Sequence, residues 1–155
     1  GNARMMFVGE APGRDEDLSG RPFVGRGGKL LSAALETVGT SRKEVFITNV
    51  VKCRPPRNRV PLKLERDTCK GAHLTRELET LGPKVVVLLG RTASFSIQGV
   101  RTLGEVRGKL IERDGRTYLS TYHPAAILRN PRLRSTFEGD LKTALAASRR
   151  NKPPK

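Results

Sequence analysis

The sequence is poor in aromatic, sulfur-containing and acidic residues. Only 5% of its 155 residues are aromatic, tryptophan is absent, and there are two cysteines and two histidines. Two cysteines without a secretion signal argue against a disulfide framework and for free thiols, metal ligands or cluster ligands. No run reaches the ~18–20 apolar residues of a transmembrane helix, and the N-terminus lacks the pattern of a signal peptide. These absences predict a cytoplasmic protein.

The shortage of acidic residues leaves the chain strongly basic. Thirty Lys and Arg residues face fifteen Asp and Glu residues, which gives a formal charge of +15. Cations that neutralise phosphates release condensed counterions, so this charge favours a polyanionic partner, although basic residues also serve solubility alone. The length allows one domain, which we expect over residues 1–148, followed by a basic, disordered tail over 149–155.

Two common nucleotide-binding motifs are also missing. No G-x-G-x-x-G joins the first apolar run to a helix, and there is no G-x-x-x-x-G-K-[ST], so neither a dinucleotide fingerprint nor a P-loop is present. Instead, the apolar residues 5–8 lead directly into Gly9-Glu10-Ala11-Pro12-Gly13, a turn that carries a carboxylate.

The hydrophobic pattern predicts an α/β fold. Nearly continuous aliphatic runs predict buried parallel strands, and their positions are 5–8, 45–50 and 85–89. Apolar residues at helical spacing alternate with these strands and predict helices that end before Gly39 and Gly82, a short helix over 92–97 and a final helix over about 133–147. Asp114-Gly115 predicts a two-residue hairpin turn between strands 109–113 and 116–121. We therefore expect a three-layer sandwich around a mostly parallel central sheet.

Three side chains are suited to binding a nucleobase, and two of them, Asn49 and His123, lie at expected strand ends, beyond which ligands of α/β proteins bind. Phe23 lies between Pro22 and nearby glycines and is suited to stacking on a flipped base, or it is an ordinary core residue. Asn49 offers a donor and an acceptor that match O4 and N3 of uracil or thymine, or it caps a turn. His123 is expected on a rigid turn before Pro124, where it either donates to an oxygen that gains negative charge or is merely structural.

Four separated motifs, taken together, closely resemble the family 4 uracil-DNA glycosylases of thermophilic bacteria and archaea. They are residues 9–13 with 20–25, residues 48–56, Cys69, and residues 123–126. The resemblance extends from Met5 to about Arg134. It implies a monofunctional enzyme of base excision repair that flips deoxyuridine out of DNA, hydrolyses its N-glycosidic bond with water, releases uracil and leaves an abasic site.

The resemblance also implies roles for individual residues. Phe23 would stack on uracil, Asn49 would read its O4 and N3 edge, and His123 would support the charge at O2. Backbone amides of the loop that contains Ala11 and Gly13 would assist at O2. Glu10 is the first candidate for the general base and Glu16, placed by the family near the pocket wall, is the second. Other glycosylases of the superfamily have an aspartate where Ala11 stands, so the base stays open.

The contacts to DNA follow from the same resemblance. Ile127 would be the wedge that fills the vacated base stack, with Leu128 as the alternative. The expected phosphate contacts are made by basic side chains, namely Lys29, Lys52, Arg54 and Arg129. A sliding clamp is left open as a further partner, and a monomer is expected.

The two cysteines are half of a ligand set. Family 4 enzymes hold a 4Fe-4S cluster with four cysteines, and Cys53 and Cys69 have the spacing of the second pair, whereas the first pair would precede Gly1. We expect a truncated sequence rather than a protein without a cluster. Two free thiols, or a zinc site formed with His73, are the alternatives. The hydrolysis itself needs no cluster.

Three other functions are kept as alternatives. A noncatalytic DNA-damage binding module would keep the uracil pocket without releasing the base. An enzyme that acts on a free mononucleotide would have no use for the charge or the wedge. A glycosylase that traps DNA covalently would need a basic, histidine-bearing insertion, which is not evident in residues 52–64.

Overall fold

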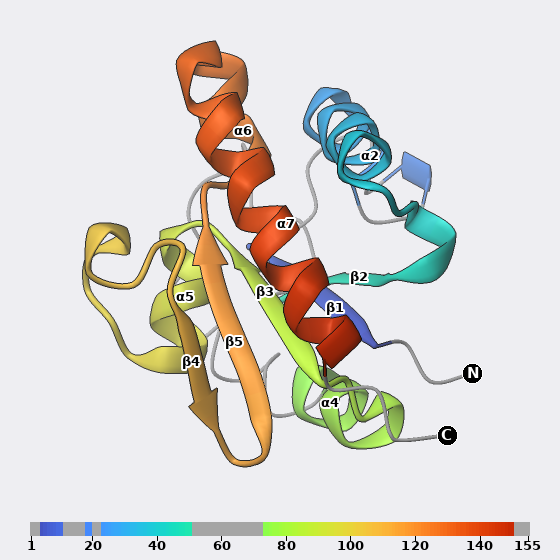
Figure 1. Cartoon of the computed structure of the whole chain (residues 1–155), viewed down its shortest axis with the longest axis vertical. Helices are drawn as coiled ribbons and strands as arrows, with labels where there is room; N and C mark the ends of the chain where they lie inside the picture. Colours follow the sequence, from blue (N-terminus) through green and yellow to red (C-terminus); the bar gives the residue numbers. More distant parts are fainter. Residues whose placement is uncertain (1–3, 11–17, 20–22, 51–72, 151–155) are drawn as a thin grey trace.

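The structure is a computed structural model that describes residues 4–10, 18–19, 23–50 and 73–150. Five strands in this part of the chain form one sheet in the order β2-β1-β3-β5-β4 (Figure 1). Their bounds are β1 Met5–Gly9, β2 Phe46–Asn49, β3 Val85–Leu89, β4 Leu110–Arg113 and β5 Arg116–Thr121. All neighbouring pairs are parallel except β4 and β5.

The antiparallel pair forms the expected hairpin. Arg113 pairs with Arg116, and both residues between them have positive φ, 52° at Asp114 and 77° at Gly115. This combination is the type I′ turn, whose twist matches that of the flanking strands. The dipeptide therefore identified the turn correctly.

Helices cover both faces of the sheet. The first face packs against α2 (Arg26–Val38) and α7 (Arg134–Arg150), and the second packs against α4 (Thr75–Leu81) and α5 (Arg91–Gln98) (Figure 1). Among the described residues, short 3-10 helices lie in the connections, namely η1 Arg42–Glu44, η4 Leu103–Glu105 and η5 Pro131–Leu133. The expected three-layer α/β sandwich with a mostly parallel sheet is confirmed.

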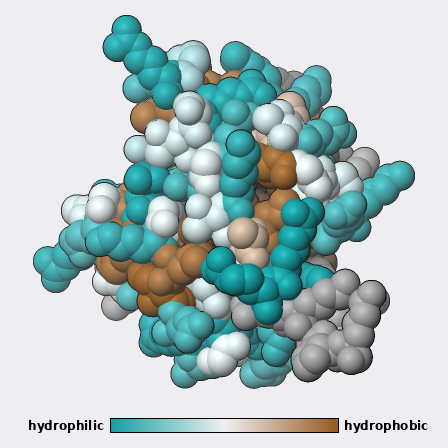
Figure 2. All heavy atoms as spheres, in the orientation of Figure 1, coloured by the Kyte–Doolittle hydropathy of each residue, from teal (hydrophilic) through white to brown (hydrophobic). Residues whose placement is uncertain are grey.

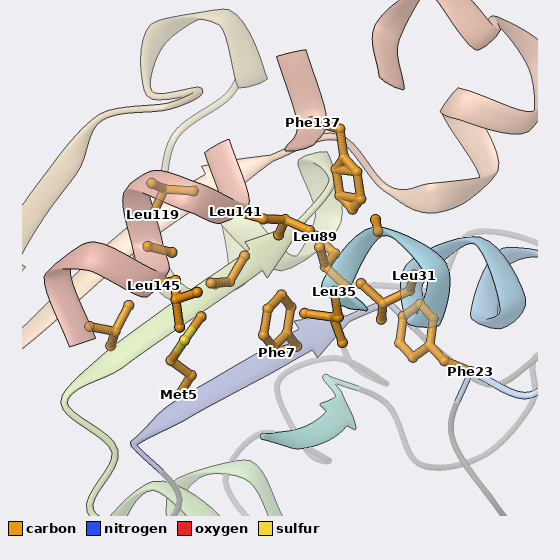
Figure 3. Packing of buried hydrophobic residues seen from close by; sticks show 14 of the residues in the cluster. Met5, Phe7, Phe23, Leu31, Leu35, Leu89, Leu119, Phe137, Leu141 and Leu145 are labelled. Atoms are coloured by element: carbon orange, nitrogen blue, oxygen red, sulfur yellow. The ribbon is translucent and has the colours of Figure 1, made fainter. Parts of the chain in front are cut away.

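The two faces of the sheet bury alternate residues of the same strands. Met5 and Phe7 of β1 point into the cluster beneath α2 and α7, whereas Met6 and Val8 point into the cluster on the side of α4 and α5. This alternation explains why the strands read as continuous apolar runs. In Figure 3, Phe23 lies beside Leu31 at one end of the first cluster. Its aromatic ring is therefore part of the hydrophobic core at that end.

Most helix ends follow the sequence pattern, with one omission. Gly39 and Gly82 have φ of 98° and 53° and end α2 and α4 in the left-handed conformation, as expected of C-cap glycines. The helix α6 (Pro124–Arg129) was missed, because six residues give too short a pattern. The helix α7 continues through Arg150, so the first two residues of the predicted tail are helical, and 151–155 lie outside the described residues.

Hydrophilic residues cover most of the face shown in Figure 2, with smaller hydrophobic patches between them. Within the described part of the chain, no helix combines the length and the apolar character that crossing a membrane requires.

Candidate active site

The carboxyl ends of the four parallel strands meet at one edge of the sheet. The pairing places Gly9, the last residue of β1, opposite Asn49, the last residue of β2. At the other end of the row, the backbone N–H of Gly90 donates to the carbonyl of Thr121, the last residue of β5, over 2.8 Å. Glu10 and His123 follow two of these ends. The sequence segments predicted to carry chemistry therefore converge.

Gly9 lies between two side chains predicted to bind the base. A Cβ atom added to Gly9 would lie 2.4 Å from Cζ of Phe23 and 2.6 Å from Oδ1 of Asn49. Both side chains thus pack directly against the Gly9 backbone, and both are buried, with 7% and 6% of their surface exposed. Only a glycine lets the strand end approach both groups so closely.

The backbone of Phe23 adopts an unusual conformation. Its φ is 51°, which is uncommon for a bulky residue and costs free energy. Gly28 of α2 permits this geometry, because an added Cβ would overlap the Phe23 carbonyl oxygen at 1.7 Å. The guanidinium of Arg42 donates to the same oxygen through Nη1. The surrounding residues therefore fix the position of the Phe23 ring.

His123 occupies the N-cap of α6 and is held from two sides. Its Nδ1 accepts a hydrogen bond from the backbone N–H of Ala125 over 3.0 Å. Gly90 presses against its other side, since an added Cβ there would lie 3.0 Å from the His123 Cβ. An amide N–H can only donate, so Nδ1 carries no proton in this arrangement and the imidazole proton sits on Nε2.

The imidazole stands beside the aromatic ring. The ring centroids of Phe23 and His123 are 5.6 Å apart, with an angle of 34° between the planes. Asn49 and the Phe23 ring both pack against the backbone of Gly9. The site thus combines an aromatic surface for stacking, an amide that offers a donor and an acceptor, and an imidazole with its donor on Nε2. These are the groups that recognition of a planar, polar base requires.

Comparison with known proteins identifies the family. Residues 1–146 match the family model described as the Uracil DNA glycosylase superfamily. The chain belongs to this superfamily. A relative from Archaeoglobus fulgidus, named Type-4 uracil-DNA glycosylase, is 48% identical over 90% of this chain and 74% of its own length.

Two further relatives carry the same name. The one from Saccharolobus solfataricus is 43% identical over 90% of this chain and 69% of its own length. The one from Thermotoga maritima is 46% identical over 83% of this chain and 68% of its own length. The resemblance to family 4 that the separated motifs indicated is confirmed.

The structure brings together Phe23, Asn49 and His123, and it places Glu10, which is half-buried, directly after β1. Several other predicted residues lie outside the described residues, namely Ala11, Gly13, Glu16, Lys52, Cys53, Arg54 and Cys69. Their roles stay predictions. The described residues contain no cluster of three or more His, Cys, Asp or Glu side chains able to hold a metal ion.

One predicted DNA contact needs correction. Ile127 was expected to be the wedge, but only 1% of its surface is exposed, and it packs in the core with α2 and α7. A side chain so placed cannot enter a base stack without leaving the core. Leu128, the alternative, is only half-buried, and the expected phosphate ligands Lys29 and Arg129 are exposed.

The sequence did not identify the residues that pack against Phe23 and His123 and hold them. Gly28 and Gly90 support Phe23 and His123 by their lack of a side chain, and Arg42 binds a carbonyl 19 residues away. Gly90 directly follows a buried strand, which is a usable signal for a position at the site. Nothing local in the sequence links Arg42 to Phe23.

Proposed function

We propose that this protein excises uracil from DNA by hydrolysing the N-glycosidic bond, with Phe23, Asn49 and His123 forming the uracil pocket. It is a uracil-DNA glycosylase, a hydrolase of DNA repair. The observation that carries the assignment of the pocket is the packing of Phe23 and Asn49 against Gly9, with His123 beside the Phe23 ring. The relatives named Type-4 uracil-DNA glycosylase support the activity.

Recognition of uracil follows from the two groups around Gly9. Uracil presents an N3–H donor next to the O4 acceptor, and the Asn49 amide offers the complementary acceptor and donor. Cytosine presents the reverse pattern and would leave buried polar groups facing groups of the same kind, which is costly. Phe23 supplies the stacking surface. Its constrained backbone keeps the ring in place before the base arrives, which lowers the cost of binding.

Departure of the base is assisted by His123. As the bond between C1′ and N1 breaks, its electron pair passes to the base, and negative charge grows on O2. A fixed donor at that oxygen is worth about 10²–10³ in rate in comparable sites. The hydrogen bond from Ala125 to Nδ1 leaves the Nε2 proton as the donor and holds the ring at a fixed angle. His123 is therefore ready for this role before substrate binds.

The nucleophile is water, whose oxygen attacks C1′ while a carboxylate takes its proton. Glu10 is our first candidate for this general base because it follows β1 directly beside the pocket, and Glu16 is the second. Assistance of this kind typically contributes about 10²–10⁴ in rate. The products are free uracil and an abasic site.

The DNA backbone would be held by exposed cations at the same edge of the sheet. Lys29 lies in the first turns of α2, and Arg129 ends α6, the helix that His123 begins. α2 and α6 lie against each other, since an added Cβ on Gly27 would contact Pro124 at 3.6 Å. Cations from two adjacent helices thus flank the pocket. Leu128 of α6 is our candidate for the wedge.

The family implies a 4Fe-4S cluster, and both cysteines of this sequence lie outside the described residues. The cubane is held by four thiolates, and this sequence contains two cysteines, Cys53 and Cys69. We propose these two as ligands, although the cysteines present do not complete the set. The reaction described above uses no redox step, and none of its steps depends on the cluster.

The test is single-turnover cleavage of a labelled oligonucleotide that contains one deoxyuridine, with matched thymine and cytosine strands. Alkali then breaks the strand at abasic sites. We expect alkali-dependent cleavage at uracil alone, and loss of most of it in Asn49→Leu, which keeps the size but removes both hydrogen-bonding groups. Thr143→Ala, on the exposed face of α7, is the matched control and should retain full activity. Binding of uracil DNA without release of uracil by the unmodified protein would contradict the proposal.

A further inference from the structure

A buried carboxylate lies near the site without belonging to it. Asp140 of α7 has 6% of its surface exposed and points toward the sheet. Its Oδ2 accepts a hydrogen bond of 2.6 Å from the hydroxyl of Thr121, and both of its oxygens lie 2.8 Å from Nη1 of Arg107. A buried carboxylate is costly unless such partners compensate its charge.

The surrounding backbone is built closely around this carboxylate. Gly108 has a φ of 74°, and an added Cβ there would lie 2.8 Å from Oδ1 of Asp140. The backbone N–H of Gly108 donates to the carbonyl of Ser120 over 2.8 Å, so the segment with Arg107 runs along the end of β5. The carboxylate is therefore enclosed by β5, α7 and the segment at residues 107–108.

The contacts of Asp140 lead to the two residues that precede His123. Thr121 is held by Asp140 through its hydroxyl and by Gly90 through its carbonyl. The guanidinium carbon of Arg107 lies 5.9 Å from the centre of the Tyr122 ring, within the range of a cation–π contact. Gly90 in turn presses against the Cβ of His123. Asp140 thus holds Thr121, and Arg107, which is paired with Asp140, holds Tyr122.

We propose that Asp140, together with Arg107, is a positioning residue for His123 in uracil excision. The inference rests on the role proposed above for His123. Asp140 does not contact the base. It fixes the end of β5 so that Nε2 of His123 meets O2 of the departing uracil. A misplacement of about 1 Å in such a site costs about 10²-fold in rate.

The test is a double-mutant cycle that joins Thr121→Val and His123→Ala. The valine keeps the shape of Thr121 and loses the hydroxyl that Asp140 holds. We expect Thr121→Val to lower the single-turnover rate about 10–100-fold when it is measured well below the melting temperature of the variant. Its affinity for uracil-containing DNA should stay within about twofold of that of the unmodified protein. In the His123→Ala background the same change should have almost no effect, because sites that act through one another are not additive. Thr121→Ser should restore the rate.

The matched control is Ser120→Ala. Ser120 is the neighbouring buried residue of β5, and its hydroxyl contacts Ser94 and Gln98 on the other side of the sheet. This change should lower the melting temperature comparably and leave the rate unchanged. If Thr121→Val does not fold, Arg107→Lys enters the same cycle, because it keeps the cation and loses the planar contact with Tyr122.

Two results would overturn the proposal: a Thr121→Val rate equal to that of the unmodified protein, or an equal loss with and without His123. A readout independent of activity separates this proposal from the proposed function. The sequence has two histidines, so the imidazole nitrogen resonances of His123 can be assigned by comparison with His123→Ala. Thr121→Val should shift them and Ser120→Ala should not. Unshifted resonances refute the positioning role, whereas an inactive unmodified protein refutes only the glycosylase.

Discussion

Replacing Gly9 with alanine should damage the pocket while leaving the fold intact. The new Cβ would lie 2.4 Å from Cζ and 2.7 Å from Cε2 of Phe23, and 2.6 Å from Oδ1 of Asn49. Ordinary van der Waals contact begins at 3.4 Å, so the Phe23 ring has to move by at least 1.0 Å. Asn49 has to move by a similar distance. Neither can move far, because both are buried.

This displacement allows the effect to be estimated. A shift of about 1 Å at a reacting centre costs about 10² in rate, or about 2.7 kcal/mol in the activation free energy. Overpacking a buried site costs about 1–3 kcal/mol of stability. We therefore expect Gly9→Ala to remain folded at moderate temperature and to excise uracil about a hundredfold more slowly. Single-turnover excision at saturating enzyme gives the rate, and thermal unfolding gives the stability.

Gly139→Ala is the matched control. Gly139 lies within α7, and an added Cβ has no neighbour within 4 Å. Alanine should therefore stabilise the protein by about 0.4–1 kcal/mol and leave excision unchanged. Unimpaired excision by Gly9→Ala, at a temperature where it is folded, would show that Phe23 and Asn49 do not form the uracil pocket against Gly9.

Four further predictions concern the other parts of the site. His123→Ala should slow excision about 10²–10³-fold and weaken DNA binding only slightly, and equal losses in both measurements would argue against a role at the departing base. Ile127→Ala should reduce the free energy of unfolding by about 2–5 kcal/mol. Leu128→Ala should lower the free energy of unfolding less than Ile127→Ala does, because Leu128 is only half-buried. It should slow excision from duplex more than from single-stranded DNA, where no stack has to be opened; equal slowing on both would refute the wedge. Removing Lys29 or Arg129 should weaken binding to any DNA sequence and reduce the slope of log K against log salt by about 0.9 each, and an unchanged slope would show that the residue contacts no phosphate.

The sheet and most helices were predictable from the sequence because their signals are local. Buried parallel strands are continuous apolar runs, and helix ends are marked by glycines such as Gly39, whose left-handed conformation other residues rarely adopt. The turn at Asp114-Gly115 has an equally local signal. The helix α6 lacked one, because six residues after a proline show no clear period.

The candidate site was predictable in its members and not in its geometry. Phe23, Asn49 and His123 could be selected because each is of a residue type suited to a base. Asn49 and His123 also adjoin expected strand ends, whereas Phe23 lies in a glycine-rich loop of a chain with few aromatic residues. Their distances depend on residues with no chemical function of their own. Gly28 and Arg42 hold Phe23 through backbone contacts made by folding, so no pattern in the sequence reports them.

Ile127 shows the opposite error, in which a motif suggested a role that packing forbids. The run after His123 is apolar and followed by a cation, which favours a wedge at the DNA surface. The helix α6 turns these residues to different sides, so Ile127 enters the core while Leu128 remains half-buried. Knowing that the segment is a helix would have separated the two residues.

The N-termini of several helices add to the positive charge of the chain. α2, α5, α6 and α7 have no acidic residue in their first turns, and α2 and α5 begin with Arg26 and Arg91. A helix N-terminus already carries a partial positive charge and is normally stabilised by acidic residues. Here no acidic residue supplies that compensation in four helices, although the His123 side chain caps α6. An anion near the N-termini of α2, α5 and α7 would supply this compensation. The proposed reaction involves two such anions, the DNA phosphates and the departing uracil.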